Sequence, residues 1–342
     1  MSLPEYSVVV PAYQAEGFIG HCVRALNGQT VDRARYEIIV VDDGSTDGTA
    51  AAARKAGADL VLHDDRRGPA AARNVGVDAA RGQIVLFTDA DCEPSPQWIE
   101  AIVAPFADGR VTGCKGTYRT RQRVLMARLV QREFEIRYQR MAELPRIDFI
   151  DAYSAAYRRR VLLEYGGFDP TYPLPSAEDV DLAFRLVRDG HLLVFVPQAW
   201  VWHRHPARLD TYLARKARYG FWRALLYLRH PEKIAGDAHT DRALKVQFLL
   251  VGMAALCALG ALLWPPLAVP ASLALVTFLA TTVPFVRWAW RRDRAVALVW
   301  PAVALLRAAL QGSGLACGLV YHGLLGRRRP SGVAEGAQRD GA

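Results

Sequence analysis

The chain has 342 residues, enough for one large domain with an appendage, and 51% of them are hydrophobic. The formal net charge of +9 fits either nucleic acid or an anionic membrane surface as a partner. The five cysteines are scattered without a CxxC pair, which fits a reducing compartment and argues against a disulfide framework or a zinc site.

Short apolar runs alternate with helical stretches along the first half of the chain. The runs that predict strands are 7–13, 36–41, 59–62 and 83–88, and a later one is 192–196. The stretches that predict helices are 14–29, 46–56, 69–80, 121–142 and 178–188. Strands that alternate with helices predict an α/β fold with a doubly wound, mostly parallel sheet.

Two acidic clusters directly follow predicted strands. Asp42-Asp43 ends one strand, and Asp89-Ala90-Asp91 ends another. Ligands of parallel sheets bind at the carboxyl ends of strands, so both clusters are expected on the binding edge. Carboxylates are the hard oxygen ligands that a metal bound to a diphosphate prefers. The alternatives are a solvated turn for Asp89-Asp91 and an Asx turn for Asp42-Asp43.

A third acidic pair, Glu178-Asp179, opens a predicted helix. Acidic residues in a first helical turn often only complement the helix dipole. A hydroxyl acceptor, however, has a high pKa and needs a positioned base. A carboxylate at this helix start, after the turn Gly166–Asp169, is suited to that task.

Six motifs together resemble one known family. In chain order they are Val8-Val9-Val10-Pro11-Ala12-Tyr13, Val41-Asp42-Asp43-Gly44-Ser45-Thr46-Asp47, Ala72-Arg73-Asn74-Val75-Gly76, Asp89-Ala90-Asp91, Gly166-Gly167-Phe168-Asp169 and Ala177-Glu178-Asp179. This set resembles the family 2 inverting glycosyltransferases with the GT-A fold, a Rossmann-like sheet. The likeness covers roughly residues 5–230 and is closest to the membrane-bound branch that makes exopolysaccharides and lipid-linked glycans.

The resemblance implies a role for each matching position. The donor nucleotide sugar would be bound by Pro11, Tyr13, Asp42 or Asp43, Arg73, Asp89 and Asp91. Asp89 and Asp91 would also hold Mn²⁺ or Mg²⁺. Asp179 would be the general base, and Glu178 would support the acceptor sugar.

Two further elements extend this expected site. Arg215-Lys216-Ala217-Arg218-Tyr219 resembles a variant of the family's QxxRW element, with Arg for Gln and Tyr for Trp. The resemblance implies that Arg215, Arg218 and Tyr219 contact the acceptor or the diphosphate, and the departure puts processive polymer synthesis in doubt. A basic interfacial helix is the alternative for this stretch. His203 is a further metal-ligand candidate and His205 a weaker one, against a structural role for each.

Apolar runs dominate the chain from residue 244 onward. Val246–Trp264 and Leu267–Val286 are long enough to span a membrane, and Pro265-Pro266 separates them as a hairpin. Arginines after the second run predict that both hairpin ends face the cytoplasm. Residues 295–325 are interrupted by Arg307, so a third membrane-embedded helix and an interfacial or re-entrant one both remain open.

The predicted organisation therefore has four parts. They are a catalytic domain (1–205), basic amphipathic interface helices (206–243), a membrane region (244–326) and a disordered tail (327–342). No basic segment followed by an apolar one occurs near residue 1, so we expect the catalytic domain in the cytoplasm and the chain at the inner membrane.

These patterns predict a metal-dependent enzyme that transfers a sugar, with inversion, to a hydroxyl of a lipid-linked glycan. UDP-sugars are favoured as donors, and GDP-sugars are possible. The alternatives are a polyprenyl-phosphate glycosyltransferase, whose acceptor needs no base, and a non-catalytic nucleotide-sugar-binding membrane protein. A nucleotidyltransferase would need a Gly-rich basic loop after the first strand, which is not found. The basic residues cluster beside apolar spans, so nucleic acid is not an expected partner.

Overall fold

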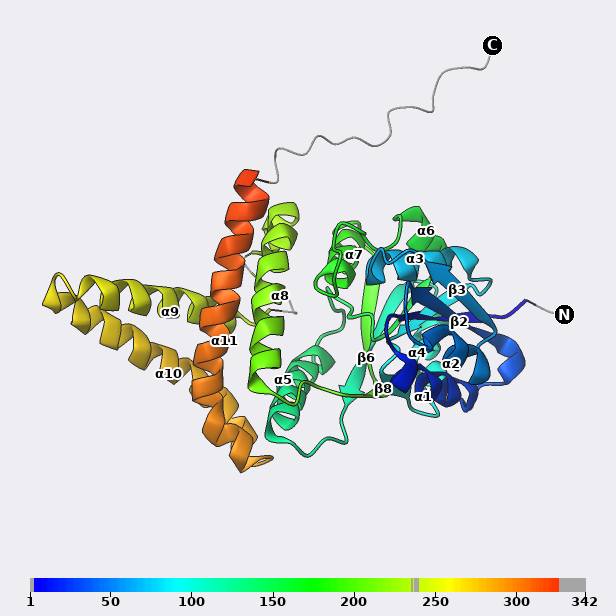
Figure 1. Cartoon of the computed structure of the whole chain (residues 1–342), viewed down its shortest axis with the longest axis horizontal. Helices are drawn as coiled ribbons and strands as arrows, with labels where there is room; N and C mark the ends of the chain where they lie inside the picture. Colours follow the sequence, from blue (N-terminus) through cyan, green and yellow to red (C-terminus); the bar gives the residue numbers. More distant parts are fainter. Residues whose placement is uncertain (1–2, 235, 237–239, 326–342) are drawn as a thin grey trace, which may run out of the picture.

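A computed structural model describes residues 3–234, 236 and 240–325 (Figure 1). The predicted tail, residues 327–342, lies outside the described residues. The strands are β1 (Tyr6–Ala12), β2 (Tyr36–Asp43), β3 (Leu60–Asp64), β4 (Ile84–Thr88), β5 (Cys92–Pro94), β6 (Val111–Arg119), β7 (Ser154–Arg158) and β8 (Leu192–His203). The strand predicted at 192–196 is therefore longer and continues to His203.

The α-helices of the first part are α1 (Glu16–Asn27), α2 (Thr49–Lys55), α3 (Pro69–Ala79), α4 (Trp98–Val103), α5 (Leu125–Ala142), α6 (Arg159–Glu164) and α7 (Glu178–Arg188). The later helices are α8 (Leu209–Arg229), α9 (Arg242–Gly260), α10 (Ala268–Trp290) and α11 (Arg294–Val320), followed by a π-helical turn at Tyr321–Leu325. Each helix predicted in the first half lies within a few residues of an observed one.

The eight strands form one sheet in the order β3-β2-β1-β4-β7-β6-β8-β5. The first four strands are parallel, so their carboxyl ends meet at one edge. β7 runs antiparallel to both β4 and β6, and β5 runs antiparallel to β8. The predicted α/β class with a mostly parallel sheet is confirmed.

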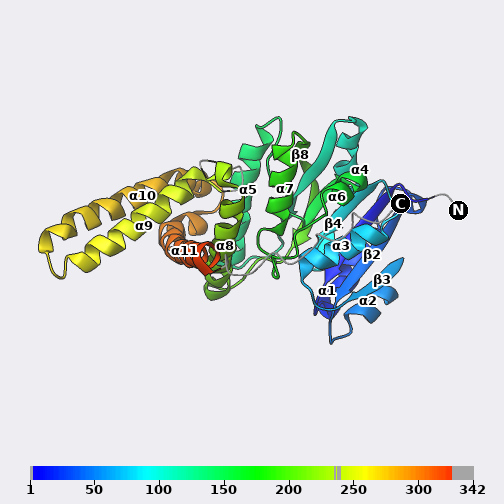
Figure 2. The ribbon, with the colours of Figure 1, turned by 90° about the horizontal axis from the view of Figure 1, so that it is seen from above.

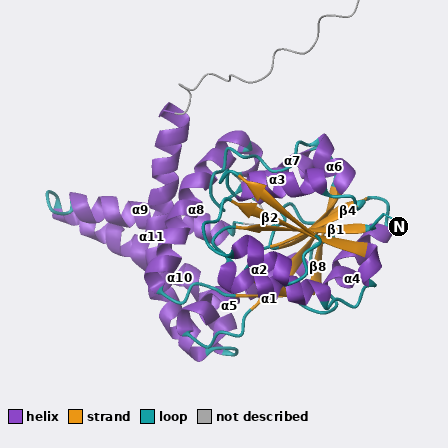
Figure 3. Cartoon of the chain, turned by 45° about the vertical axis from the view of Figure 1, so that its right-hand side comes forward, coloured by secondary structure: helices purple, strands orange, loops and turns teal. Residues whose placement is uncertain are grey.

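Helices cover both faces of the sheet (Figure 3). One face buries side chains of α3, α6 and α7 against the sheet, and the other buries those of α1, α2 and α4. The alternation of strands and helices along the chain produces this double layer, because right-handed crossovers between parallel strands place helices on the two faces.

The last three helices are long and apolar enough to cross a membrane. The α9–α10 hairpin projects away from the sheet, whereas α11 runs across the base of the hairpin and alongside α8 (Figures 1 and 2). Despite Pro301 and Arg307, α11 is one continuous helix. The predicted C-terminal apolar helices are thus confirmed as helices.

Candidate active site

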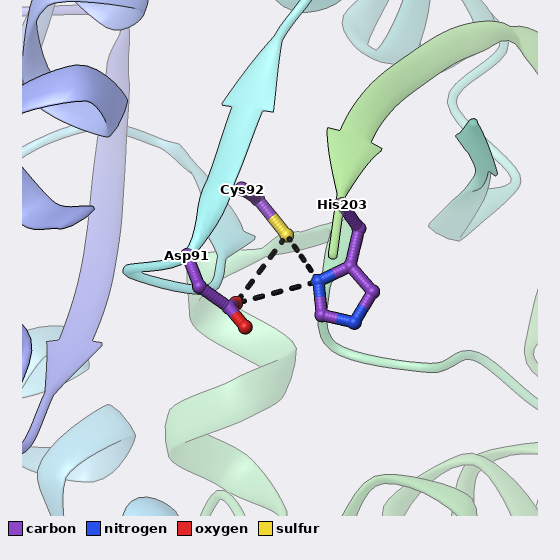
Figure 4. A group of neighbouring side chains, drawn as sticks. All are labelled: Asp91, Cys92 and His203. Carbon is purple, nitrogen blue, oxygen red and sulfur yellow. Dashed lines mark hydrogen bonds and ion pairs between the residues drawn. The ribbon is translucent and has the colours of Figure 1, made fainter. Parts of the chain in front are cut away.

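The short strand β5 brings a distant histidine to the acidic turn after β4. β5 pairs with β8 in a register that places Cys92 opposite His203. The imidazole Nδ1 of His203 lies 3.5 Å from Oδ1 of Asp91 and 3.7 Å from the sulfur of Cys92 (Figure 4). Tyr118 stacks on the His203 ring with 4.4 Å between ring centroids, which fixes the orientation of the imidazole. The turn after β4 and the end of β8 therefore form one site.

Asp91 and His203 fit a divalent metal ion. Burial raises the pKa of the Asp91 carboxyl, but the hydrogen bond and charge of His203 outweigh burial and lower this pKa overall. The Asp91 side chain is 39% exposed, so its carboxylate can reach a ligand. Burial and the charges of Asp91 and Asp89 raise the pKa of the Cys92 thiol well above its usual range. A protonated thiol is a poor ligand for Mn²⁺ or Mg²⁺, so Asp91 and His203 are the metal-ligand candidates here.

Asp89 forms an ion pair with Arg73. The guanidinium of Arg73 donates to Oδ1 of Asp89 at 3.1 Å and to Oε1 of Glu178 at 2.9 Å. Arg73 and Glu178 are buried, whereas the Asp89 side chain is 31% exposed. Burial lowers the pKa of Arg73, but the negative charges of Asp89 and Glu178 raise it more, so this pKa lies above its usual value. Arg73 thus links the acidic turn after β4 to the start of α7.

Asp179 begins the second half of the site, beside the buried Arg73–Glu178 pair. Its Oδ2 accepts a hydrogen bond from the backbone N–H of Ala152 at 3.1 Å, which fixes the carboxylate. Burial raises the pKa of Asp179 to about 8, and the charges of Glu178 and Asp151 act in the same direction. Such a pKa suits a group that accepts a proton near neutral pH.

Helix α8 places the predicted Arg215–Tyr219 element against this site. Burial raises the pKa of the Tyr219 phenol. The positive charges of Arg215 and Arg218 act to lower this pKa, and the negative charges of Asp179 and Glu178 act to raise it. The charge of Arg215 also helps to lower the pKa of Asp91. Arg215 therefore interacts electrostatically with Asp91, and Tyr219 with the Glu178-Asp179 pair. Arg218 acts on Tyr219.

The predicted nucleotide end lies at the carboxyl ends of β1 and β2. Oδ1 of Asp42 accepts a hydrogen bond from the Ser45 N–H at 3.1 Å, the Asx turn considered from the sequence. The carboxylate of Asp43 accepts a hydrogen bond from the Gly68 N–H at 3.0 Å. Both carboxylates are buried, and each accepts a hydrogen bond from a backbone N–H of a neighbouring loop. Gly44 has a φ of +72°, which allows the tight turn that directly follows Asp43.

Tyr13 and Pro11 border the same end of the site, where Tyr13 is 42% exposed. The guanidinium of Arg66 lies 4.8 Å from the centre of the Tyr13 ring. Arg66 has a φ of +52°, an uncommon backbone conformation for a residue other than glycine. This arrangement offers an aromatic and cationic wall to a planar base.

Sequence reasoning did not identify Arg66, Tyr118 or Asp151 as members of the site. Arg66 and Asp151 belong to no motif, and Tyr118 lies in an ordinary strand pattern, so only the folded chain reveals them. His205 has a structural position, because it is buried and its Nε2 lies 2.9 Å from Oε1 of Gln131.

Comparison with known families assigns this domain. The family described as glycosyl transferase family 2 matches residues 7–166, which run from the second residue of β1 to beyond β7 and include the acidic turn. Residues 7–166 therefore match the family 2 glycosyltransferases, and the resemblance inferred from the motifs is confirmed.

Individual relatives support the same class. The chain is 29% identical over 255 residues to a pre-mycofactocin glycosyltransferase of Mycobacterium tuberculosis, a match that covers 72% of this chain and 52% of the relative. It is 38% identical over 104 residues to glycosyltransferase AglE of Haloferax volcanii, which covers 29% of this chain and 34% of AglE. The chain thus spans about half of the length of the mycobacterial relative and about a third of that of AglE.

A solved structure with a similar fold is the mannosyltransferase PcManGT of Pyrobaculum calidifontis. It was solved with GDP-Man and Mn²⁺. The TM-score is 0.59 at 22% identity, and the match covers 92% of this chain and 88% of PcManGT. This likeness confirms the predicted GT-A fold.

Proposed function

We propose that this chain transfers a sugar from a nucleotide-diphosphate donor to a hydroxyl of a membrane-associated, lipid-linked glycan, with inversion at the anomeric carbon. The observation that carries the proposal is the arrangement around Arg73. This one guanidinium joins the acidic turn after β4, where a donor diphosphate would bind, to the Glu178-Asp179 pair, where an acceptor would be deprotonated.

The reaction would be a single in-line displacement. Asp179 accepts the proton of the acceptor hydroxyl as its oxygen attacks the anomeric carbon, and the bond from that carbon to the diphosphate oxygen breaks. Attack from the face opposite the leaving group inverts the anomeric configuration. Glu178 holds Arg73 in place, and the Ala152 N–H orients the Asp179 carboxylate.

The donor would lie along the carboxyl ends of β1, β2 and β4. Pro11, Tyr13 and Arg66 would contact the base, and Asp42 or Asp43 its polar edge or the ribose. Asp91 and His203 would hold Mn²⁺ or Mg²⁺, with Asp89 beside the ribose or the diphosphate. When bound, the metal ion stabilises the negative charge on the departing nucleoside diphosphate. Arg215 would add positive charge at the same place.

The acceptor would come from the membrane. Tyr219 of α8 interacts electrostatically with the proposed base, and α8 packs along its length on the apolar helix α11. Only one helix therefore separates the catalytic carboxylates from an apolar helix. A phosphate acceptor is ionised already and needs no base, so Asp179 favours a glycan hydroxyl over polyprenyl phosphate. We place the chain in the inner membrane with its catalytic domain in the cytoplasm.

The test is donor turnover by the detergent-purified chain. A panel of UDP- and GDP-sugars, including GDP-mannose, is incubated with Mn²⁺, Mg²⁺ or EDTA and with membrane lipid extracts as acceptors. We expect metal-dependent release of one nucleoside diphosphate and a glycosylated lipid of inverted configuration. Asp91→Ala should abolish both, whereas Asp65→Ala, in an exposed loop, should not. A retained configuration would refute the displacement, and the absence of metal-dependent nucleotide binding would favour a non-catalytic protein.

A further inference from the structure

Helix α11 is as long and apolar as a membrane span, but besides the hairpin helices α9 and α10 it packs on α5 of the catalytic domain and, most extensively, on α8. At its start, Asp293 forms an ion pair with Arg128 of α5 at 2.9 Å. Near its middle, Arg307 forms an ion pair with Glu133 of α5 at 2.6 Å. Just beyond its end, the His322 ring lies 4.8 Å from that of Phe221 in α8. Helices α5 and α8 together therefore accompany α11 over its whole length.

The contact with α8 is close because small residues meet at it. A Cβ atom on Gly314 would lie 2.1 Å from the carbonyl oxygen of Ala217, and one on Gly318 would lie 2.3 Å from that of Phe221. A Cβ on Gly220 would lie 2.1 Å from the carbonyl oxygen of Gln311. The two helices thus run side by side with backbones in contact, and α11 cannot enter a bilayer core without α8.

Helix α8 is unsuited to a bilayer core. It carries five basic residues, Arg215, Lys216, Arg218, Arg223 and Arg229. Each would cost about 2.5–3.5 kcal/mol at the centre of a spanning helix. Helix α5, which flanks the first half of α11, is also rich in charge. An α11 that crossed the membrane would bring this charge into the hydrocarbon.

The outer face of α11 is an apolar stripe. It is formed by the exposed side chains Leu298, Ala302, Leu306, Leu310 and Val320, with Leu324 in the turn just beyond the helix, and Ser313 is an exposed polar residue within it. Arg307, the single Asp, Glu, Lys or Arg in residues 295–325, points inward to Glu133 and is only 11% exposed. Such a stripe, on a helix whose opposite face is covered, fits the boundary between lipid head groups and acyl chains.

The α9–α10 hairpin points in a different direction from α11, away from the catalytic domain (Figures 1 and 2). Its tip is uncharged and exposes Leu262, Leu263 and Trp264. Its base carries Arg242 and Lys245 on one helix and Arg287 on the other. By their lengths the two helices reach roughly 28 Å and 34 Å, which matches a hydrocarbon core of about 30 Å.

We propose that the hairpin alone penetrates the membrane and that α11 lies flat on the surface from which the hairpin enters. The catalytic domain, both hairpin ends and the C-terminal end of α11 then share one side. This topology also removes a conflict in the sequence, because a third crossing would put the basic Arg327–Arg329 segment on the opposite side from the basic hairpin base. The proposal does not depend on the proposed reaction.

Two tags on the full chain test the sidedness. Each terminus carries an epitope released by the same site-specific protease, and the chain is reconstituted in vesicles of phosphatidylcholine and phosphatidylglycerol. Protease is then added outside, with detergent-opened vesicles as the control for complete cleavage. We expect every molecule to lose both tags or to keep both. Molecules that each lose one tag would overturn the proposal, because α11 would then cross.

The depth of side chains of the α11 stripe in the bilayer can be measured independently. Nitroxide labels are placed at Leu298→Cys, Leu306→Cys and Val320→Cys, in a background with Cys257→Ser and Cys317→Ser. Leu256→Cys in the hairpin is the deep reference. We expect the three α11 labels at one shallow depth, about 5–10 Å below the head groups, and Leu256 far deeper. A steady change of depth from Leu298 to Val320, or a shallow Leu256, would refute the arrangement.

Discussion

Asp179 is the residue on which the proposed chemistry depends most. Its carboxylate is oriented by the Ala152 N–H and lies next to the Arg73–Glu178 pair. We expect Asp179→Asn to lower kcat by about 10²–10⁴-fold, because the side chain keeps its shape but can no longer accept a proton. Donor binding, measured by calorimetry with the metal ion, should change little.

The matched control for this variant is Asp189→Asn, just beyond the other end of α7. Asp189 contacts Tyr165 and Arg188 at the surface, and among the described residues it has no contact with the proposed site. The activity of the Asp189→Asn enzyme should stay within twofold of that of the wild type. An Asp179→Asn enzyme that turns over normally would show that another group is the base.

The raised pKa of Asp179 predicts a pH dependence of activity. Because burial raises this pKa to about 8, the base is largely protonated at pH 6 in the unliganded enzyme. We expect kcat/KM to rise with pH and to level off above the pKa of Asp179. A profile that is flat between pH 6 and pH 8 would contradict this assignment, provided the chain remains folded.

The same shift predicts a pH dependence of stability with a definite sign. A folded-state pKa above the usual 3.8 means that the folded chain binds the proton more tightly than the unfolded chain. This stabilisation is complete below about pH 4 and is lost as the pH rises through about 8. Asp179→Asn mimics the neutral form, so its Tm relative to wild type should increase from pH 5 to pH 9. A difference in Tm that does not vary with pH would argue against the shift.

At the scale of elements, the packing of α8 on α11 depends on glycine. In an open helical position, Gly→Ala is expected to stabilise by up to about 1 kcal/mol. At Gly314 the new methyl group would instead meet the Ala217 carbonyl, so Gly314→Ala should separate the helices and lower Tm. Gly252→Ala in α9 has open space around it and should leave Tm unchanged or raise it. Equal effects of the two changes on Tm would refute this close contact.

At the scale of the whole molecule, a buried polar network joins the catalytic domain to the apolar C-terminal helices. Glu133 of α5 contacts Tyr212 and Lys216 of α8 and Arg307 of α11. Arg307 also donates to Gln247 of α9 at 3.1 Å. Although burial raises the pKa of Glu133, the charges of Lys216 and Arg307 lower it overall, so it remains a carboxylate. One side chain thus connects helices from both parts of the chain.

Removing this charge should destabilise the chain. Glu133→Gln leaves Lys216 and Arg307 without their counter-charge, and breaking such a buried pair costs about 3–5 kcal/mol. We expect a lower Tm in detergent, and a smaller loss in the double variant with Arg307→Gln than the two single losses added together. Glu135→Gln, a half-buried position on the same helix, should cost less than about 1 kcal/mol. Purely additive losses would mean that the network does not couple the two parts.

Local patterns in the sequence are sufficient to predict the domain class and the acidic residues of the proposed site. Apolar periodicity identified the strands that position Asp42, Asp43, Asp89 and Asp91, because parallel strands place their carboxyl ends at one edge. It also identified the start of α7 at Glu178 and the apolar C-terminal helices. These features are local in the chain, so a local pattern is sufficient to find them.

Which of these residues meet depends on contacts between distant parts of the chain. His203 reaches Cys92, 111 positions earlier in the chain, because β8 continues seven residues beyond its predicted end and pairs with β5. Arg73 bridges Asp89 and Glu178 through contacts between residues far apart in the sequence. The direction of α11 also depends on such contacts. Its composition is that of a membrane span, but the neighbours that decide where it lies, Arg128, Glu133 and Phe221, come from earlier helices, and no local pattern encodes them.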